Sequence, residues 1–466
     1  MDQPPRLPLW FLFANWAMVL LALATGFYLG NRRIADLPEP QGSAIQLVWN
    51  EILKSHVEEQ DGSLLLDRAI GAMVDELDPY SRYVPPGEAA AYDEANTGHY
   101  EGIGVVMVQH GEDLVIHYPM TGGPAERAGL RPGDRVVAVD GADLRTTPLD
   151  ERHAAAARMV RGPAGTTVRL RIAREGGEQE FTVARSGVQQ TSVKWAHVAD
   201  ADQRVGYAHL AHFQQGSADD LARAIETLQA GGPLRGFVLD LRGNGGGSLE
   251  ECVAITNLFL QSGTIVSQRR RGSEVVETRT SDPQKCRFPA LPLAVLLDGG
   301  SASASEVLAG ALHDHGRAVL VGTPTYGKGY VNTNYKWKEF RLKLTTAHFF
   351  TPSGRNIERP NRRLVTEGRA TAEERAAFDA GGIHPDVETR VTKAEATAVA
   401  AMLEARETPP QHLAAFTAVA AKHGIRVPGP PTAETDSQLA KALAALRERI
   451  TAPSNGSPNG TPPKER

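Results

Sequence analysis

Cysteine is nearly absent from the 466-residue sequence, which holds it only at Cys252 and Cys286. Two thiols cannot build a disulfide framework; they could pair in an oxidising compartment, but two separate buried thiols are the simpler interpretation. Excess positive charge is also lacking, since the formal net charge is -5 and the pI is near 6.3. Nucleic acid is therefore not an expected partner. The 14 histidines show no zinc-ligand spacing, so no metal site is expected.

Charged side chains are missing from residues 7–31, and this gap predicts a membrane segment. The run is long enough for a hydrocarbon core of ~30 Å, and Trp10 and Tyr28 lie where aromatic rings favour the interface. We therefore expect an uncleaved anchor over residues 1–33. A cleaved signal peptide is the alternative, because residues 22–24 (ALA) resemble a cleavage site.

The stretch VGTPTYGKGY, residues 321–330, departs from the phosphate-binding loop pattern at one position. The pattern G-x-x-x-x-G-K-[ST] is filled up to Lys328, but Gly329 replaces the hydroxyl that would bind magnesium. The chain that follows is rich in Tyr, Val, Thr and Phe, which predicts a strand where a phosphate loop needs a helix. Lys328 is instead a candidate general base, because burial lowers a lysine pKa from its usual value of ~10.4. The alternative is a solvated lysine in a turn.

Four further regions follow the predicted anchor. Residues 34–98 have apolar positions at helical spacing and are interpreted as packing helices without chemistry. Residues 99–185 are rich in alternating strand patterns, and residues 186–390 alternate strands with helices. Residues 391–466 predict a helical extension that ends in a disordered Pro/Gly/Ser/Asn tail.

The β-rich region opens with EGIGVV, a glycine turn that leads into a strand. Such a turn can capture a terminal carboxylate while a peptide adds to the sheet edge, although a plain β-domain fits the pattern equally well. The stretch PAERAGLRPGDRVVAVDG resembles the helix-turn-strand segment of bacterial PDZ domains. That resemblance implies peptide binding by Gly102, Ile103 and Gly104.

A candidate nucleophile lies in LLDGGSASASEVLAGAL, where a buried strand turns into a helix. A serine at a helix N-terminus lies beside free N–H groups that stabilise an oxyanion. The alternative is structural, because Ser303 and Glu306 fit the S-x-x-E capping box. The pattern alone does not choose among Ser301, Ser303 and Ser305.

Taken together, the motifs of residues 40–390 resemble the carboxyl-terminal processing peptidases, also called tail-specific proteases. They include LDPYSRYVPP, VLDLRGNGGG, the SASAS run, TYGKGYV, FFTPSGRNI and GGIHPDV, in that order. The resemblance implies an α/β multi-domain fold with a stacked β-α core of the crotonase/Clp-protease type and an inserted PDZ-like domain. It further implies a nucleophile at Ser303, its base at Lys328, and an oxyanion hole formed by the Gly246 and Ala304 amides.

One position departs from the family pattern. Four residues after the lysine the family usually has a glutamine that orients the amine, and this chain has Asn332. Its amide is one methylene shorter, so it reaches Lys328 only if the strand shifts or a water intervenes. Asn332 therefore also supports a competing hypothesis, a catalytically inactive PDZ-bearing binding or scaffold protein.

The resemblance implies a serine endopeptidase that cleaves unfolded or C-terminally exposed proteins without metal, nucleotide or other cofactor. A homo-oligomer is left open. Arg6 precedes the anchor and Arg32 and Arg33 follow it, which weakly favours the cytoplasm for the remaining chain. Bacterial relatives work outside the cytoplasmic membrane. The arginine difference is small, so we expect a single-pass anchor with the catalytic part on the periplasmic or extracytoplasmic side.

Overall fold

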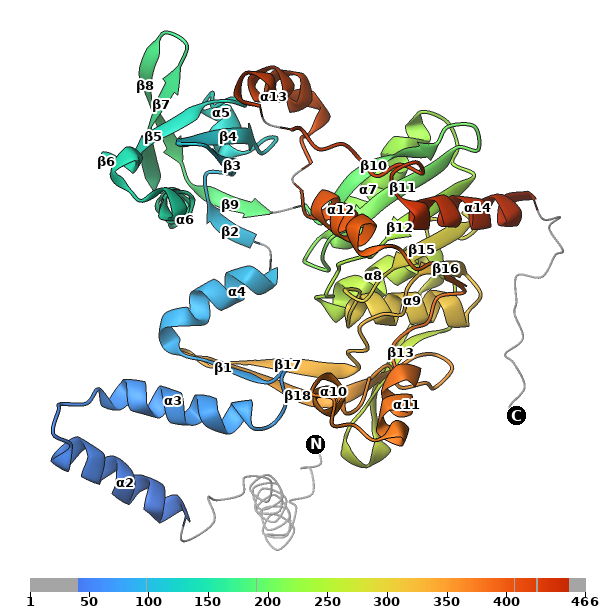
Figure 1. Cartoon of the computed structure of the whole chain (residues 1–466), viewed down its shortest axis with the longest axis horizontal. Coiled ribbons are helices and arrows are strands. Elements are labelled where there is room, and N and C mark those ends of the chain that lie inside the picture. Colours follow the sequence, from blue (N-terminus) through green and yellow to red (C-terminus); the bar gives the residue numbers. More distant parts are fainter. Residues whose placement is uncertain (1–40, 98, 190, 406, 425, 452–466) are drawn as a thin grey trace, which may run out of the picture. The chain divides into compact units, whose positions relative to one another are not determined.

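The computed structural model describes residues 41–451 except 98, 190, 406 and 425 (Figure 1). The chain divides into two compact units, Met1–Leu77 and Asp78–Arg466. This division falls inside the predicted helical region 34–98, and the other predicted domain bounds stay predictions. The predicted anchor over 1–33 and the predicted tail lie outside the described residues. Within the described part, no helix has the length and apolar character needed to span a bilayer.

The described part of the first unit consists of α2 (Gln41–Ser55) and α3 (Gly62–Asp75). Asp61 begins α3 as an N-cap, because its Oδ1 accepts hydrogen bonds from the Ser63 and Leu64 amides at 2.8 and 3.1 Å. Such a cap satisfies amides that have no partner inside the helix. The prediction of helices is confirmed here.

The second unit begins with Asp78 and then forms β1 (Arg82–Val84), η1 (Pro86–Glu88) and α4 (Ala89–Thr97). A β-rich block with its own hydrophobic core follows. Its elements are β2 (His99–Gly102), β3 (Val105–His110), β4 (Asp113–Pro119), α5 (Pro124–Arg127), β5 (Arg135–Val139), β6 (Ala142–Asp143), η2 (Leu144–Thr146), α6 (Leu149–Val160), β7 (Thr167–Arg174), β8 (Gly177–Ala184) and β9 (Ser186–Gln189). The main sheet has the order β3-β4-β5-β7-β8, which leaves β3 at an edge, and β2 pairs separately with β9.

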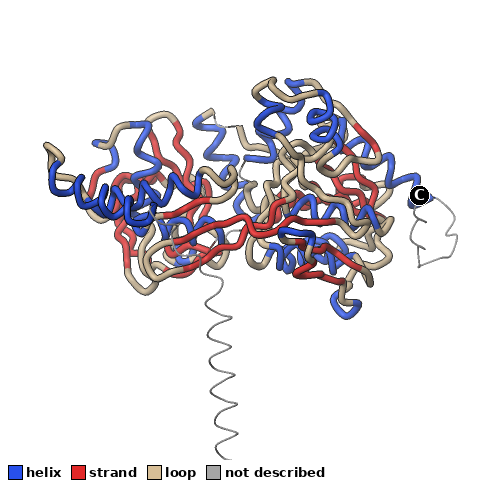
Figure 2. The backbone as a smooth tube through the Cα atoms, turned by 90° about the horizontal axis from the view of Figure 1, so that it is seen from below, coloured by secondary structure: helices blue, strands red, loops and turns tan. Residues whose placement is uncertain are grey.

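The next block alternates strands and helices, as predicted (Figures 1 and 2). Its elements are β10 (Val193–Asp200), β11 (Val205–Leu210), α7 (Ser217–Ala230), β12 (Gly236–Asp240), α8 (Leu249–Phe259), β15 (Leu293–Leu297), α9 (Ala304–Asp314), β16 (Ala318–Gly322) and β19 (Val387–Glu388). The sheet order is β10-β11-β12-β15-β16-β19, and every pair after β10-β11 is parallel. Strands β11, β12 and β15 are buried throughout, as expected for parallel strands covered on both faces.

The two faces of this sheet pack against different helices. Phe237 and Leu239 of β12 join the core formed with α7, α8 and α9. Val238, between them, joins the core formed with α12 (Lys393–Glu404) and α14 (Ser437–Thr451). Alternate residues of a strand point to opposite faces, so the sheet is covered on both sides.

A second sheet is antiparallel and contains β1, β13 (Thr264–Arg269), β14 (Val275–Thr280), β17 (Tyr330–Lys336) and β18 (Arg341–Phe350). Strand β17 starts two residues after Lys328. The chain therefore continues as a strand after the GKG sequence, as predicted, and the geometry of a phosphate-binding loop is absent from this described stretch.

The last described residues, 391–451, form what we call the C-terminal segment. It contains α12, α13 (Pro410–His423) and α14, and it follows α10 (Arg362–Thr366) and α11 (Ala372–Ala380). Helices α12 and α14 pack on the core sheet, whereas α13 contacts β4 of the β-rich block. The described part of the predicted extension is thus mainly helical, and it packs along both blocks.

Candidate active site

The serine turn connects β15 to α9 and holds Ser303 in an unusual backbone conformation. Ser303 has φ 57° and ψ -115°, just before the first residue of α9. A positive φ is uncommon for a residue with a side chain and costs of order 1–3 kcal/mol where it lies outside the allowed regions. Ser303 is partly exposed and lines a cavity of about 960 Å³. Comparable strained strand-to-helix turns present nucleophilic serines in other hydrolases.

The structure distinguishes the three serines that the sequence pattern left equivalent. Ser301 and Ser305 are fully buried. Their hydroxyls donate to main-chain carbonyls, Ser301 to Leu241 and Ser305 to Asn244, both at 2.8 Å. Ser301 and Ser305 therefore hold the turn together, and Ser303 is the serine that lines the cavity.

Glu306 connects the serine turn to residues 325–329, which we call the lysine loop. Its carboxylate accepts from the Ser303 amide at 2.8 Å, as the capping-box pattern predicted. The same carboxylate accepts from the amides of Gly327 at 2.6 Å and Lys328 at 2.8 Å, and from the Thr325 hydroxyl. The side chain is wholly buried, and burial raises the pKa of its carboxyl above the ordinary value. The capping interpretation was correct, but it covered only one of four contacts.

Lys328 lines the same cavity as Ser303. Burial, reinforced by the positive charge of Lys343, lowers the pKa of Lys328 to about 8. An amine with this pKa is neutral in a useful fraction of molecules near neutral pH, which a general base requires. This lowered pKa has the direction that a buried general base needs, and the role of Lys328 as the base stays a prediction.

Residues close to the lysine include three that sequence analysis did not identify, Asp78, Tyr80 and Glu358. The ring centroid of Tyr80 lies 4.7 Å from Lys328 Nζ. Asp78 fixes the tyrosine's loop, because its Oδ1 accepts from the Tyr80 amide at 2.8 Å. Glu358 Oε2 accepts from the Gly329 amide at 2.7 Å, and burial raises the pKa of Glu358 to about 7. The interpretation of residues 34–98 as packing alone missed Asp78 and Tyr80, although they lie in the LDPYSRYVPP motif.

Asn332 lines the cavity but makes its described hydrogen bond elsewhere. Its Nδ2 donates to Thr345 Oγ1 at 3.0 Å, across the β17-β18 pair. The Thr345 hydroxyl in turn donates to Asp78 Oδ1 at 3.0 Å. The predicted role of Asn332 in orienting Lys328 stays a prediction, and it now depends on the amide oxygen of Asn332.

The predicted oxyanion-hole residues lie next to the serine. A Cβ on Gly246 would come within 2.9 Å of the Ser303 Cβ and the Ala304 nitrogen, so only glycine fits at this position. The described hydrogen bonds include none donated by the Ala304 amide, at the first turn of α9. The Gly246 amide, by contrast, donates to Asn244 Oδ1 at 2.9 Å. The oxyanion-hole role of both residues stays a prediction. The two amides differ, because the Gly246 amide already donates a hydrogen bond and the Ala304 amide donates none that is described.

The predicted peptide-binding turn precedes the edge strand β3. Ile103 is buried, and its carbonyl accepts from the Ala125 amide at 2.9 Å. Gly104 has φ 69°, which favours glycine, and its carbonyl accepts from the Met120 amide at 2.9 Å. Gly102 ends β2 and pairs with Ser186. An edge strand is the geometry that peptide addition needs, and peptide binding itself stays a prediction.

The two cysteines are separate free thiols. Cys252 is wholly buried below the serine turn, and its Sγ donates to the Ala304 carbonyl at 3.2 Å. Burial raises the pKa of the Cys252 thiol to about 12, which keeps it protonated and inert. The prediction of two separate thiols is confirmed, but only Cys252 is fully buried, because Cys286 is half-buried.

Comparisons with known proteins relate the two blocks of the chain to known families. The profile of peptidase family S41 matches residues 204–389, and that of the PDZ domain matches residues 115–174. The "Probable CtpA-like serine protease" of Staphylococcus haemolyticus is 35% identical over 360 residues, which cover 74% of this chain and 71% of that protein. The "Carboxy-terminal processing protease CtpA" of Bacillus subtilis is 31% identical over 364 residues, 76% of this chain and 75% of that protein.

Two solved structures are also similar to the chain. One is a photosystem II D1 C-terminal processing protease, with 26% identity over 78% of this chain and 92% of that one, and a TM-score of 0.40. The other is a putative S41 protease from Bacteroides fragilis, with 19% identity over 84% of this chain and 99% of that one, and a TM-score of 0.43. Neither superposition reaches a TM-score of 0.5.

Proposed function

The chain belongs to peptidase family S41, among its carboxy-terminal processing serine proteases, and we propose that Ser303 and Lys328 form its catalytic dyad. One observation carries this proposal. The strained Ser303 and a lysine with a lowered pKa line one cavity, and Glu306 binds the main chains of both residues.

The proposed reaction begins with the neutral amine of Lys328. Lys328 Nζ takes the proton of Ser303 Oγ as that oxygen attacks the scissile carbonyl carbon. The tetrahedral intermediate collapses when the lysine ammonium gives its proton to the leaving amine, which leaves an ester on Ser303. Lys328 then takes a proton from water, the hydroxide attacks the ester, and the proton returns to Ser303 Oγ.

The oxyanion is stabilised by the Ala304 amide at the start of α9 and by the Gly246 amide in the turn between β12 and α8. The Ala304 amide lies beside Ser303 and needs no rearrangement, and the helix dipole favours negative charge there. The Gly246 amide joins the oxyanion hole only by giving up its hydrogen bond to Asn244 Oδ1. We therefore expect Ala304 to supply the first hydrogen bond to the substrate.

Cleavage of a denatured protein by the full chain in detergent tests the proposal. We expect the wild type to cleave it and Ser303→Ala to lose cleavage while unfolding at the same temperature. A fluorophosphonate should label the wild type and not Ser303→Ala. Equal cleavage by both proteins would reject the assignment of Ser303.

We further propose that the β-rich block binds the C-terminal tails of substrates at the turn of Gly102, Ile103 and Gly104. The support is the open edge of β3 beside this turn. Binding of a labelled peptide to the inactive Ser303→Ala chain should require a free terminal carboxylate. If the amidated peptide bound equally well, carboxylate capture by this turn would be wrong.

A second candidate function is an inactive PDZ-bearing binding protein. The observation in its favour is the hydrogen bond from Asn332 to Thr345, which engages the amide nitrogen away from Lys328. Probe labelling separates the two candidates, because an active dyad labels at Ser303 only while Lys328 is present. An unlabelled wild type that still binds C-terminal peptides would favour the binding protein.

We also propose that residues 7–31 anchor the chain with its catalytic part outside the cytoplasm. The support is the uncharged run itself and its length. The full chain should resist extraction from membranes at alkaline pH, and protease added outside the cytoplasmic membrane should digest it. Protection of the chain until the membrane is opened would place it on the cytoplasmic side.

A further inference from the structure

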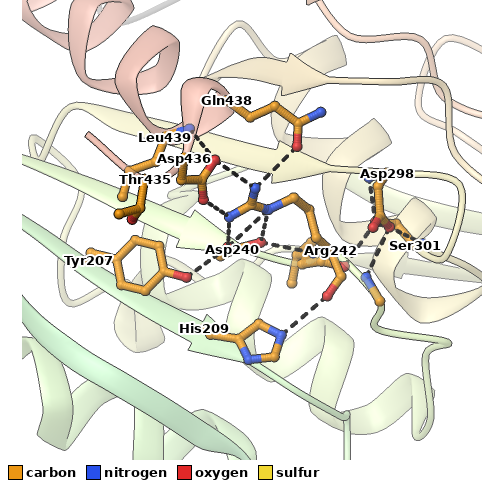
Figure 3. A network of polar contacts seen from close by, with 12 residues as sticks. Tyr207, His209, Asp240, Arg242, Asp298, Ser301, Thr435, Asp436, Gln438 and Leu439 are labelled. Carbon is orange, nitrogen blue, oxygen red and sulfur yellow. Dashed lines mark hydrogen bonds and ion pairs between the residues drawn. The ribbon is translucent and has the colours of Figure 1, made fainter. Parts of the chain in front are cut away.

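An arginine with a fully buried side chain precedes residues 243–247 (GNGGG), the turn beside Ser303 that we call the glycine turn. Arg242 is 1% exposed, and Figure 3 shows its guanidinium between two carboxylates. Asp240, the last residue of β12, accepts from Arg242 Nη2 at 2.6 Å and from Nε at 3.0 Å. Asp436, in the C-terminal segment, accepts from Nη2 at 2.6 Å and from Nη1 at 3.0 Å. Asp436 thus binds the guanidinium with both carboxylate oxygens, the strong bidentate arrangement.

The position of Asp436 is set by the docking of α14. Asp436 Oδ1 also accepts from the Leu439 amide at 3.0 Å, as the N-cap of a helix does. Leu439, Leu443 and Leu446 of α14 are buried against the core sheet. Gln438 adds a further contact, because its Oε1 accepts from Arg242 Nη1 at 3.1 Å. The carboxylate therefore reaches Arg242 only when α14 lies on the sheet.

The main chain that follows Arg242 builds one wall of the candidate active site. The Gly243 amide donates to Asp298 Oδ1 at 2.9 Å, and that same oxygen accepts from the Gly300 amide in the serine turn at 2.9 Å. The Asn244 carbonyl accepts from the Ala302 amide at 3.0 Å. Hydrogen bonds thus join the glycine turn to the serine turn at two places, and Figure 3 shows Asp298 and Ser301 of the serine turn beside Arg242.

We propose that Asp436 is a positioning residue for peptide cleavage. By fixing the Arg242 side chain, it holds the main chain of the glycine turn at the distance from Ser303 that the oxyanion hole requires. The inference rests on the proposed function of Ser303 and Gly246. It assigns to the C-terminal segment a part in catalysis that lies beyond its packing on the core.

The role that we propose for Asp436 depends on its charge and not only on the packing of α14. A buried guanidinium that loses one of its carboxylate partners is left incompletely compensated, and the structure relaxes to reach another acceptor or water. Arg242 is tied to the turn through its own main chain, so this relaxation moves the turn. Asp436→Asn keeps the shape and an N-cap oxygen but removes the charge and one acceptor.

The test compares Asp436→Asn with Arg447→Gln in the full chain. Arg447 lies on the same helix, and its guanidinium binds Asp200 at 2.7 Å, a contact that does not include Arg242. Both variants weaken the docking of α14, and only Asp436→Asn disturbs Arg242. We expect kcat of Asp436→Asn to fall about 10- to 100-fold with KM little changed, below the ~10²–10³ seen when an oxyanion donor is removed. Arg447→Gln should keep the wild-type kcat.

A peptidyl boronate gives a second readout that packing alone would not move. It forms a tetrahedral adduct with the serine, so its affinity reports the oxyanion hole rather than substrate docking. We expect Asp436→Asn to weaken boronate inhibition by about the same factor as kcat, while binding of a C-terminal tail peptide is unchanged. If Asp436→Asn does not fold, Gln438→Leu serves instead, with a smaller loss of kcat and boronate affinity in the same proportion.

The outcomes separate this inference from the proposed function. A wild type without Ser303-dependent cleavage would overturn both. An active wild type with unchanged kcat and boronate affinity in Asp436→Asn would overturn the role of Asp436 alone. An equal loss of kcat in Arg447→Gln would also overturn it, because the effect would then come from docking of the helix.

Discussion

Lys328 shows how one residue acquires its chemistry from its surroundings. Burial lowers its pKa to about 8, and the charge of Lys343 acts in the same direction. The neighbouring Glu358 has a pKa raised to about 7 by burial. Both groups therefore change charge within a narrow range around neutral pH, where the proposed dyad would work.

The first prediction concerns the pH dependence of cleavage. A general base must be neutral, so kcat/KM should rise with pH through the Lys328 pKa of about 8 and level off above it. Removing a positive charge should raise the lysine pKa, so Lys343→Gln should move this midpoint to higher pH. A pH profile of kcat/KM for both proteins measures the shift. A profile that falls between pH 7 and 9 would contradict Lys328 as the base.

The second prediction concerns Asn332, which stands where the family usually has glutamine. Asn332→Gln should preserve or raise kcat, because the longer amide reaches the lysine amine. Asn332→Ala should lower kcat about 10- to 100-fold, as expected for a supporting group. Lys328→Ala and Lys328→Arg should be far worse, since neither side chain can accept the serine proton near neutral pH.

The order of these variants is what the kinetics must reproduce. If Asn332→Ala matched the wild type while Lys328→Ala was inactive, Asn332 would be a strand residue without a catalytic role. Its hydrogen bond to Thr345 would then be structural.

At the scale of elements, the carboxylate of Glu306 both caps the start of α9 and binds the loop that carries Lys328. Glu306 satisfies the free amide of Ser303 at the helix N-terminus and also three donors of the lysine loop. Each oxygen accepts from two donors, so both are fully used. The helix therefore positions the base as well as the nucleophile.

The third prediction is that Glu306→Gln harms both stability and catalysis. An amide nitrogen cannot accept, so one pair of buried donors is left without a partner. We expect the free energy of unfolding to fall by about 1–3 kcal/mol. We also expect kcat to fall at least 10-fold, because the loop that carries Lys328 loses hydrogen bonds that fix its position.

Glu374→Gln is the matched control. Glu374 and Thr371 form the capping box of α11, where Thr371 is exposed and Glu374 only half-buried, in contrast to the wholly buried Glu306. This variant should cost less than about 1 kcal/mol and leave kcat unchanged. Urea unfolding and steady-state kinetics of the two variants decide the matter; equal effects would mean that Glu306 acts as a cap only.

At the scale of the second unit, the C-terminal segment contacts both blocks. Phe416 of α13 is 1% exposed, and its ring centroid lies 3.9 Å from that of His117 on β4. The His117 Nε2 is within 2.6 Å of the Thr408 hydroxyl. Lys422 binds Glu175 of the β-rich block at 2.6 Å. The same segment ends in α14, which delivers Asp436 to Arg242.

The fourth prediction is that Phe416→Ala releases α13 from the β-rich block. Truncating a buried phenylalanine costs about 3–5 kcal/mol, and here the loss falls on a local contact. Amide exchange in residues 410–423 should become faster, while exchange in β11 and β12 stays slow. Leu413→Ala, an exposed position of the same helix, should change neither. Equal exchange in Phe416→Ala and the wild type would mean that α13 is held by other contacts.

Local pattern was enough to predict much of the fold. The strand after Lys328 was predicted because Tyr, Val and Thr favour strands and a helix would have needed different residues. The alternation of strands and helices in 186–390 was predicted because apolar residues recur about every 2 residues in a half-buried strand and about every 3.6 in an amphipathic helix. Family resemblance then named Ser303 and Lys328, and the structure places both on one cavity.

The sequence by itself therefore determined the elements and the reactive residue types, because these depend on neighbours a few positions apart. Only the tertiary structure decided which serine lines the cavity, that Tyr80 lies against Lys328, and that Asp436 holds Arg242. These contacts join residues up to 248 positions apart in the chain, such as Tyr80 and Lys328, and local spacing carries no record of them. The pKa of Lys328 belongs to the same class, since desolvation is a property of everything packed around the amine.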